Sequence, residues 1–275
     1  THPSGARATL PLWLERGDEG PTTPPGASEP AVIPLLAGLS DEDRYVPAGW
    51  CILGGDPLAI DALPRTRVWV DGFVMKRHPV TNGEYLAFLR DVDRPDLVPG
   101  ALDRAAPVRP WRRSTTWDLP EDEPHHHAAS PVTLVDLPSA LAYIAWRSRR
   151  EGVDWRLPTA AEREKAARGA DGRRWPWGDH HEPGWSRMIG TRSTPTIARI
   201  DEHEDDVCIY GIHGLAGNVR DWTSTLWPGE PDLHIVKGGA WSSVEAMCRP
   251  ATRLANRPSD RFHNCGLRIV RSTFR

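Results

Sequence analysis

The sequence predicts a loop-rich domain built from short strands and few long helices. Of its 275 residues, 27 are Pro and 24 are Gly, and this punctuation favours many turns over long regular elements. The aromatic residues are unusual in kind, with 13 Trp against 4 Phe and 4 Tyr. The chain is 39% apolar, which suffices for one large core or for one domain with an appendage.

The charge balance and the hydropathy argue against several classes of partner. The formal net charge is −3 at pH 7, so nothing favours nucleic acid or an anionic membrane. The longest apolar run, AVIPLLAGL, contains Pro and is too short to span a bilayer. No charged segment followed by an apolar one marks a secretory signal. We therefore expect a cytoplasmic protein with no membrane span and no nucleic-acid partner.

The cysteines are few and widely spaced. Cys51, Cys208, Cys248 and Cys265 form no CxxC pair, which argues against a zinc ribbon and against a dense disulfide framework. We expect them to be free thiols.

Residues 1–43 differ from the rest of the chain. They are rich in Pro and Gly and carry few periodic apolar positions, so we expect a linker or the end of a preceding module there. Residues 44–275 then form the domain. Within it, residues 65–80 alternate Val68, Val70 and Phe73 with polar residues, which is typical of a strand.

Three helices and two further strands follow along the chain. Thr81 or Asn82 can cap a short helix, whose apolar face is Tyr85, Leu86, Phe88 and Leu89. We expect a long irregular insert over residues 91–130. Residues 135–152 form the clearest helical pattern, with Leu141, Ile144 and Ala145 on one face, extended by Trp146. Strands are expected at 234–241 and 265–272.

The third helix has the sharpest boundaries. Thr159 and Glu162 have the spacing of a capping box, and Gly169 suits a left-handed position at the C-terminal end.

Six segments, taken in order, resemble the successive signatures of the formylglycine-generating (sulfatase-modifying factor) family. They are VPAGWCILGGD, VDGFVMKRHPVTNGEYLAFL, SPVTLVDLPSALAYIAW, WRLPTAAEREKAARGADGRRWPWGD, YGIHGLAGNVRDWT and VKGGAWSS with the later GLRIV, and they cover roughly residues 44–272. The resemblance implies an α+β domain, a variant of the C-type lectin fold with short strands and few helices. It also implies that Arg156 is architectural and pairs with a buried carboxylate or with carbonyls.

The start of the chain carries a second resemblance. LPLWLERGDEGPTTPPG is similar to the junction, in some bacterial multidomain proteins, between a Ser/Thr kinase region and a C-terminal domain of this family. The kinase signatures HRD and DFG are missing from the chain, so a kinase domain would lie upstream. The implied role is that of a sensory or structural domain of a kinase.

The family's oxidative chemistry depends on two cysteines, five positions apart, that hold Cu(I). The second position corresponds to Cys248, but the first is Ser243. Because Cu(I) is soft and prefers thiolates, a hydroxyl is a poor substitute. We therefore expect no copper site and an inert Cys248. The alternative is a copper- or metal-dependent oxidoreductase centred on Cys248 with a second ligand that the sequence does not reveal.

The resemblance leaves calcium open as a cofactor. Family members often bind Ca²⁺ around a GNVWEW segment through hard oxygen ligands. Carried over to this chain, Gly217 and Val219 supply carbonyls and Asp221 the carboxylate, while Gly214 stands where the amide ligand would be. The sequence thus predicts a weakened calcium site.

Two charged runs are expected to be solvated rather than metal-binding. They are the histidines 125–127 in the acidic loop PEDEPHHHAAS and the acidic residues between 201 and 206.

The segment 241–264 also resembles the ligand-binding face of variable proteins from diversity-generating retroelements. In those proteins the stretch between GG[SA]W and G[FL]R is hypervariable. The implied ligand-binding residues here are Trp241, Ser242, Ser243, Glu245, Met247, Thr252, Asn256, Arg257, Asp260, Arg261, Phe262, His263 and Asn264. Aromatic anchors beside adaptable polar groups suit a recognition surface.

Together these features predict a non-catalytic ligand-recognition domain. Its ligand would be a protein or peptide that docks on residues 241–264. The oxidoreductase centred on Cys248 and the kinase-associated sensory or structural domain are the alternatives.

Overall fold

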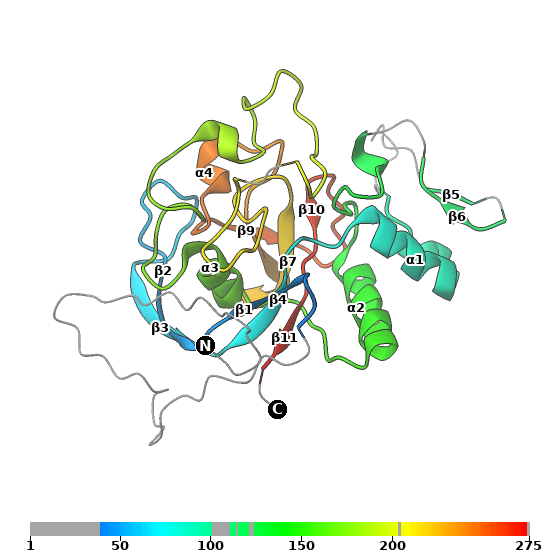
Figure 1. Ribbon diagram of the computed structural model, residues 1–275, viewed down its shortest axis with the longest axis horizontal. Coiled ribbons are helices and arrows are strands. Elements are labelled where there is room, and N and C mark those ends of the chain that lie inside the picture. Colours follow the sequence, from blue (N-terminus) through cyan, green and yellow to red (C-terminus); the bar gives the residue numbers. More distant parts are fainter. Residues whose placement is uncertain (1–38, 101–110, 114, 121–123, 203–204, 274–275) are drawn as a thin grey trace.

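The computed structural model describes residues 39–273, apart from residues 101–110, 114, 121–123 and 203–204 (Figure 1). Residues 1–38, which make up most of the predicted linker, lie outside the described residues. Helices and short strands mix along the chain, in agreement with the predicted α+β class. The described strands are β1 (Asp43–Val46), β2 (Gly49–Leu53), β3 (Thr66–Val70), β4 (Phe73–Lys76), β5 (Arg112–Arg113), β6 (Trp117–Asp118), β7 (Arg220–Trp227), β8 (Glu230–Lys237), β9 (Arg253–Asn256), β10 (Cys265–Gly266) and β11 (Val270–Ser272).

The strands pair in four small groups. The largest has the order β10-β7-β8-β9, with β10 parallel to β7 and the other pairs antiparallel. A second sheet has the order β1-β4-β11, and β2–β3 and β5–β6 form separate pairs. The expected strand at 65–80 is in fact two strands in different sheets, because the chain turns at Asp71 and Gly72. The expected strand at 265–272 likewise divides into β10 and β11.

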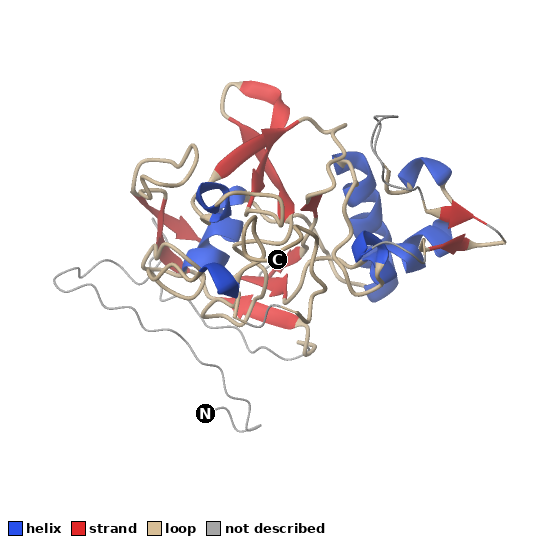
Figure 2. Cartoon of the chain, turned by 90° about the horizontal axis from the view of Figure 1, so that it is seen from above, coloured by secondary structure: helices blue, strands red, loops and turns tan. Residues whose placement is uncertain are grey.

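The helices are α1 (Asn82–Val92), α2 (Leu137–Glu151), α3 (Ala160–Arg168) and α4 (Glu245–Cys248), with 3₁₀ turns at η1 (Pro95–Leu97), η2 (Pro124–His126) and η3 (Pro183–Trp185). Figures 1 and 2 show α1 and α2 together on one side of the strands. None of the helices in the described ranges is long and apolar enough to cross a bilayer. The insert at 91–130 contains η1, β5, β6 and η2, so it is less irregular than predicted.

Local sequence signals set the helix ends. Thr81 caps α1 and Thr159 caps α3, and both capping boxes are complete. Arg156 pairs with the carboxylate of Glu162 at 2.6 Å, as predicted. Gly169 has a positive φ of 66° but a ψ of −155°, so it adopts a conformation that glycine favours, outside the predicted left-handed helical region.

The buried face of α2 differs from the prediction. Ile144 and Trp146 are buried as predicted, but Leu141 and Ala145 are exposed, and Leu137, Ala140 and Tyr143 are buried in their place. The large aromatic side chains of Tyr143 and Trp146 enter the core, and they determine which face of α2 is buried. Tyr143 stacks on Tyr85 of α1, with ring centroids 5.6 Å apart.

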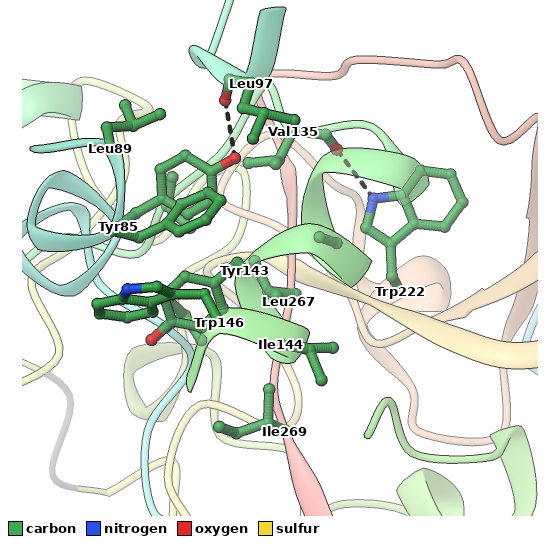
Figure 3. Packing of buried hydrophobic residues seen from close by; sticks show 14 of the residues in the cluster. Tyr85, Leu89, Leu97, Val135, Tyr143, Ile144, Trp146, Trp222, Leu267 and Ile269 are labelled. Carbon is green, nitrogen blue, oxygen red and sulfur yellow. Dashed lines mark hydrogen bonds between the residues drawn. The ribbon is translucent and has the colours of Figure 1, made fainter. Parts of the chain in front are cut away.

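The first core lies between α1, α2 and the β7–β8 strands (Figure 3). All four predicted apolar residues of α1 are buried there. Two polar groups of aromatic side chains in this core are hydrogen-bonded. The Tyr85 hydroxyl donates to the Leu97 carbonyl at 2.8 Å, and Trp222 Nε1 donates to the Val135 carbonyl at 3.0 Å. The aromatic groups are therefore buried without loss of hydrogen bonds.

Helix α3 buries charged side chains on the other face of β7 and β8. Arg163 pairs with Asp221 at 2.6 Å, and Glu164 pairs with Lys237 at 2.8 Å. All four side chains are almost fully enclosed. On its own, burial would raise the pKa of Glu164, but Lys237 and Arg168 hold that pKa below its ordinary value.

We predict that Glu164→Gln destabilises the fold strongly. It leaves the buried Lys237 ammonium without its counter-charge, and breaking such a pair costs about 3–5 kcal/mol. Urea unfolding followed by tryptophan fluorescence measures the change. Glu230→Gln, at an exposed position of β8, is the matched control and should change the free energy of unfolding by about 0.5 kcal/mol or less. Equal effects of the two substitutions would contradict the role given to α3.

Candidate functional site

The segment 241–264 follows β8 through Gly238 and Gly239, adds β9 to the edge of the same sheet and ends just before β10. In the view of Figure 1, α4 and β10 lie in the upper half of the molecule, away from the C-terminus. Gly238 has a φ of 87°, and a side chain on Gly239 would collide with the Sγ atom and the backbone of Cys248. The paired glycines are therefore needed to bring the start of the segment over α4.

The two positions that correspond to the family's copper-binding cysteines hold no pair of accessible thiols. The Ser243 side chain is buried, and its Oγ accepts hydrogen bonds from Arg220 Nη2 at 2.8 Å and from the Ala240 amide at 3.1 Å. Cys248 is fully buried beside Trp175, Met188 and Ala216. Burial raises the pKa of its thiol to about 12, so this sulfur remains protonated at neutral pH.

The remaining cysteines do not replace the missing thiolate. Cys265 is fully buried on β10, where burial raises its pKa above the ordinary range. Cys51 and Cys208 belong to the second core, which α3 shares with β1–β4. All four cysteines are free, as predicted.

The carboxylate of the predicted calcium site lies beside two cations, and its Oδ1 atom has no partner among the described residues. Asp221 is fully buried, and its Oδ2 atom lies 2.6 Å from Arg163 Nε and 3.6 Å from Arg268 Nε. Two guanidinium groups thus occupy the neighbourhood of the carboxylate and would repel a divalent cation. Gly217 and Val219 lie in the same loop, where the Val219 amide donates to the Gly217 carbonyl at 2.9 Å. Across the described part of the chain, no group of three or more acidic, His or Cys side chains is placed to hold a metal ion.

The acidic run at 201–206 is only partly solvated, contrary to the prediction. Asp206 is buried, and its carboxylate accepts hydrogen bonds from the amides of Leu215, Ala216 and Gly217 at 3.1–3.2 Å. It thereby fixes the loop that leads into β7. Glu204 lies outside the described residues.

The predicted ligand-binding residues fall into exposed, partly exposed and buried groups. Arg257, Phe262 and His263 are exposed, and Trp241, Ser242, Glu245, Met247, Asp260, Arg261 and Asn264 are partly exposed. The expectation of exposure is wrong for Ser243 and Thr252, and Asn256 is buried as well.

The buried members hold the segment together. The Thr252 hydroxyl donates to the Ala246 carbonyl at 2.6 Å and accepts from the Ile60 amide at 3.1 Å. Asn256 Nδ2 donates to Cys265 Sγ at 3.7 Å. These side chains face inward because they contact polar groups that are buried beneath the segment. Backbone amides and carbonyls need hydrogen-bond partners once they are buried.

Several partly exposed members are also engaged within the protein. Arg261 binds the carboxylate of Asp136 at 2.7 Å and the carbonyl of Val98 at 2.9 Å, so it fastens the segment to the start of α2. Glu245 pairs with Arg249 at 2.8 Å. Asp260 accepts from the Arg257 amide at 2.7 Å and closes a turn.

Aromatic rings gather at the exposed end of the segment. The ring of Trp241 lies 5.3 Å from that of His263 and 5.1 Å from that of His125, measured between centroids. We call Trp241, His125 and His263 the aromatic patch. Phe262 is 43% exposed next to it in the chain, and Val244 is 50% exposed between Trp241 and α4. The expectation of solvated histidines is wrong for His126, which is buried, while His125 contacts Trp241.

Sequence reasoning missed Arg220, which lies beside this segment at the start of β7. Its guanidinium contacts Ser243 Oγ, and its backbone amide donates to the Asn264 carbonyl at 3.0 Å. The signal was visible in the sequence, because GNVRDW carries Arg where the family segment GNVWEW carries Trp.

A cavity of about 610 Å³ opens elsewhere, between the β1-β4-β11 sheet and the helices α1 and α2. The ion pairs Asp43–Lys76 and Glu84–Arg147 lie in its wall, at 2.8 Å and 2.6 Å. No residue of 241–264 lines it, so it is separate from the predicted surface.

Comparison with known proteins agrees with this architecture. The sulfatase-modifying factor enzyme 1-like domain matches residues 38–273. The formylglycine-generating enzyme of Mycobacterium tuberculosis is 29% identical over 66% of this chain and 72% of its own length. The mouse inactive C-alpha-formylglycine-generating enzyme 2 is 27% identical over 84% of this chain and 86% of its own.

Longer proteins also match. Serine/threonine-protein kinase Pkn1 of Chlamydia trachomatis is 29% identical over 77% of this chain, which spans only 35% of the kinase. Likewise the chain spans 49% of the uncharacterized Bacillus subtilis protein YfmG, which is 25% identical over 77% of this chain.

Two solved structures share the fold. PvdO from Pseudomonas aeruginosa superimposes with a TM-score of 0.69 at 22% identity, over 84% of this chain and 94% of that one. Treponema denticola variable protein 1 superimposes with a TM-score of 0.63 at 16% identity, over the same shares of the two chains.

We predict that Arg261→Ala lowers the free energy of unfolding by about 1–3 kcal/mol, because it removes charge-assisted hydrogen bonds to Asp136 and leaves that carboxylate unpaired. Arg257→Ala, four residues earlier and exposed, is the matched control and should cost about 0.5 kcal/mol or less. Chemical denaturation of both variants measures the two changes in the free energy of unfolding. If Arg261→Ala is as neutral as its control, Arg261 is free for a ligand instead.

Proposed function

The chain belongs to the family of sulfatase-modifying factor enzyme 1-like domains, and we propose that it acts as a ligand-recognition domain and not as an oxidase. One observation carries the proposal. At the position of the first copper-binding cysteine stands Ser243, a buried hydroxyl that is engaged by Arg220 and by the Ala240 amide. Cys248, at the position of the second copper-binding cysteine, is fully enclosed and protonated.

The recognition surface that we propose is the exposed part of residues 241–264. The aromatic patch and the neighbouring Phe262 and Val244 offer large apolar contacts, and Ser242 and Asn264 offer polar ones. Binding energy at protein interfaces concentrates on such aromatic anchors. The buried Thr252 and Asn256 and the paired Arg261 support this surface from behind. Its ligand is a protein or a peptide.

The related proteins described above are consistent with a binding role. An inactive formylglycine-generating enzyme, a variable protein and a kinase stand among them. We accordingly propose that the fold is the variant of the C-type lectin fold, that the segment 241–264 is the part that can vary, and that the domain works beside a kinase domain. The competing function is a metal-dependent oxidoreductase centred on Cys248.

Copper titration separates the two functions. With a buried thiol of pKa about 12 and no second thiolate beside it, the reduced protein should not compete with a chromogenic chelator for Cu(I). Cys248→Ala should behave as the wild-type protein does. Tight equimolar Cu(I) binding that disappears in Cys248→Ala would establish the oxidoreductase and refute the recognition domain.

Selection of binders tests the surface directly. A phage-displayed library of random peptides is selected on the immobilised wild-type protein, and the affinities of the enriched peptides are measured by calorimetry. We expect Trp241→Ala, and His263→Ala to a smaller extent, to weaken them about tenfold or more, because both remove anchor area. Leu141→Ala removes an exposed apolar side chain from α2, outside this surface, and should leave the affinities unchanged. Peptides that bind regardless of Trp241 and His263 would rule this surface out.

A further inference from the structure

Arg220 is a largely enclosed cation that the described chain does not neutralise. Its Nη2 atom donates to Ser243 Oγ at 2.8 Å and contacts Met247 Sδ at 3.6 Å, and both acceptors are uncharged. Its Nε atom is buried without an acceptor among the described residues. Several other enclosed arginines have carboxylate partners, for example Arg163 with Asp221 and Arg249 with Asp56.

The groups around Arg220 do not supply a negative charge. Burial lowers the pKa of Arg220, although a guanidinium remains protonated at neutral pH. The titratable neighbours that favour its charged form are Cys265 and Cys248, whose own pKa values burial raises far above neutrality. A desolvated charge without a counter-charge is costly, so a bound anion would stabilise this site.

A second polar atom next to Arg220 also lacks a partner. Asn264 Oδ1 is buried without a donor in the described residues, while Asn264 Nδ2 donates to Ser242 Oγ at 3.0 Å. Buried unsatisfied polar atoms are rare in folded proteins. Asn264 Oδ1 is an acceptor and needs a donor such as water, whereas the Arg220 guanidinium needs an anion. A water molecule can satisfy a hydrogen bond, but it does not compensate the charge of the guanidinium.

Arg220 is only partly buried, and His263 of the aromatic patch lies near it. The third guanidinium nitrogen, Nη1, has no acceptor in the described ranges and is not among the enclosed atoms without partners. His263, on the patch, is close enough to Arg220 for the cation to contribute to lowering its pKa, after the larger effect of desolvation. The imidazole is therefore neutral near pH 7, and the site presents one positive charge.

We propose that Arg220 recognises a carboxylate, and that the surface of residues 241–264 selects peptides that present an aspartate or glutamate side chain beside an apolar residue. The inference rests on the proposed recognition function and names the chemistry of its ligand. A single guanidinium matches the single charge of a carboxylate, and its Nη1 atom is the group left to donate to it. The aromatic patch and Val244 provide the apolar contact next to it.

The first experiment uses acetate as the probe and does not depend on any peptide. Sodium acetate is titrated into ¹⁵N-labelled protein against sodium chloride at equal ionic strength, and the indole N–H resonance of Trp241 is followed. We expect a saturable shift with acetate in the wild-type protein and none in Arg220→Gln. The control Arg174→Gln, at an exposed arginine of another loop, should respond as the wild type does. No difference between acetate and chloride overturns the carboxylate site.

The second experiment uses the peptides selected on the wild-type protein. Acidic residues should be enriched among them, and replacing the shared Asp by Asn, or Glu by Gln, should weaken binding about tenfold or more. The same peptide change should have little effect on Arg220→Gln, whereas Arg220→Lys should retain part of the preference. Because the peptide is the changed partner, this comparison holds in the wild-type protein even if a variant is unstable.

The outcomes are distinguishable. Peptides that need Trp241 but show no acidic preference contradict the carboxylate site and leave the recognition surface standing. A preference for phosphorylated over acidic peptides also contradicts it. Acetate binding at Arg220 with no Trp241-dependent peptide supports the anion site and contradicts the recognition surface.

Discussion

The contact between α3 and the β7–β8 pair is the constraint on which the rest of the structure depends. Asp221 and Lys237 are direct neighbours across these two strands. They bind two consecutive residues of α3, Arg163 and Glu164, at 2.6 Å and 2.8 Å. Charges buried this deeply are stable only with near-ideal partners, so the pairs fix both the distance and the register of the helix on the sheet. The same helix reaches β2 and β3, because the Lys165 ammonium donates to the carbonyls of Pro47, Gly49 and Val70 at 2.6–3.1 Å.

The candidate site takes its geometry from this contact. Successive residues of a strand point to opposite faces, so the face that Asp221 presents to α3 determines where Arg220 and Trp222 lie. Trp222 enters the core under α1 and α2, and Arg220, the first residue of β7, reaches Ser243. On β8, Lys237 directly precedes the glycine pair that starts the segment 241–264. Displacing α3 would therefore move both sides of the proposed recognition surface.

Local rules account for what the sequence could predict. The cap at Thr81, the capping box of Thr159 and Glu162, and the pairing of Arg156 with a carboxylate join residues at most six positions apart, and they are confirmed. The buried charges of α3 could not be found in this way, because a helical segment rich in Glu, Arg and Lys reads as solvent-facing until its partners on β7 and β8 are known. Arg261 was assigned to the surface for the same reason: its partner Asp136 lies 125 positions away in the chain. The overall class was reachable because the ordered signatures of a whole family extend along the domain.

The replacement of the copper-binding pair and the presence of Arg220 are best understood together. With a thiolate at position 243, the guanidinium would have a counter-charge within contact distance. Arg220 stands where the family segment GNVWEW has Trp, while Ser243 is neutral and Cys248 is held as a neutral thiol, so a positive charge is present with no negative charge to balance it. Burial makes that imbalance costly, and an anion bound from outside is the simplest way to remove it. The residue changes that argue against oxidation are thus the same ones that leave a cation beside the aromatic patch, where a ligand carboxylate would be recognised.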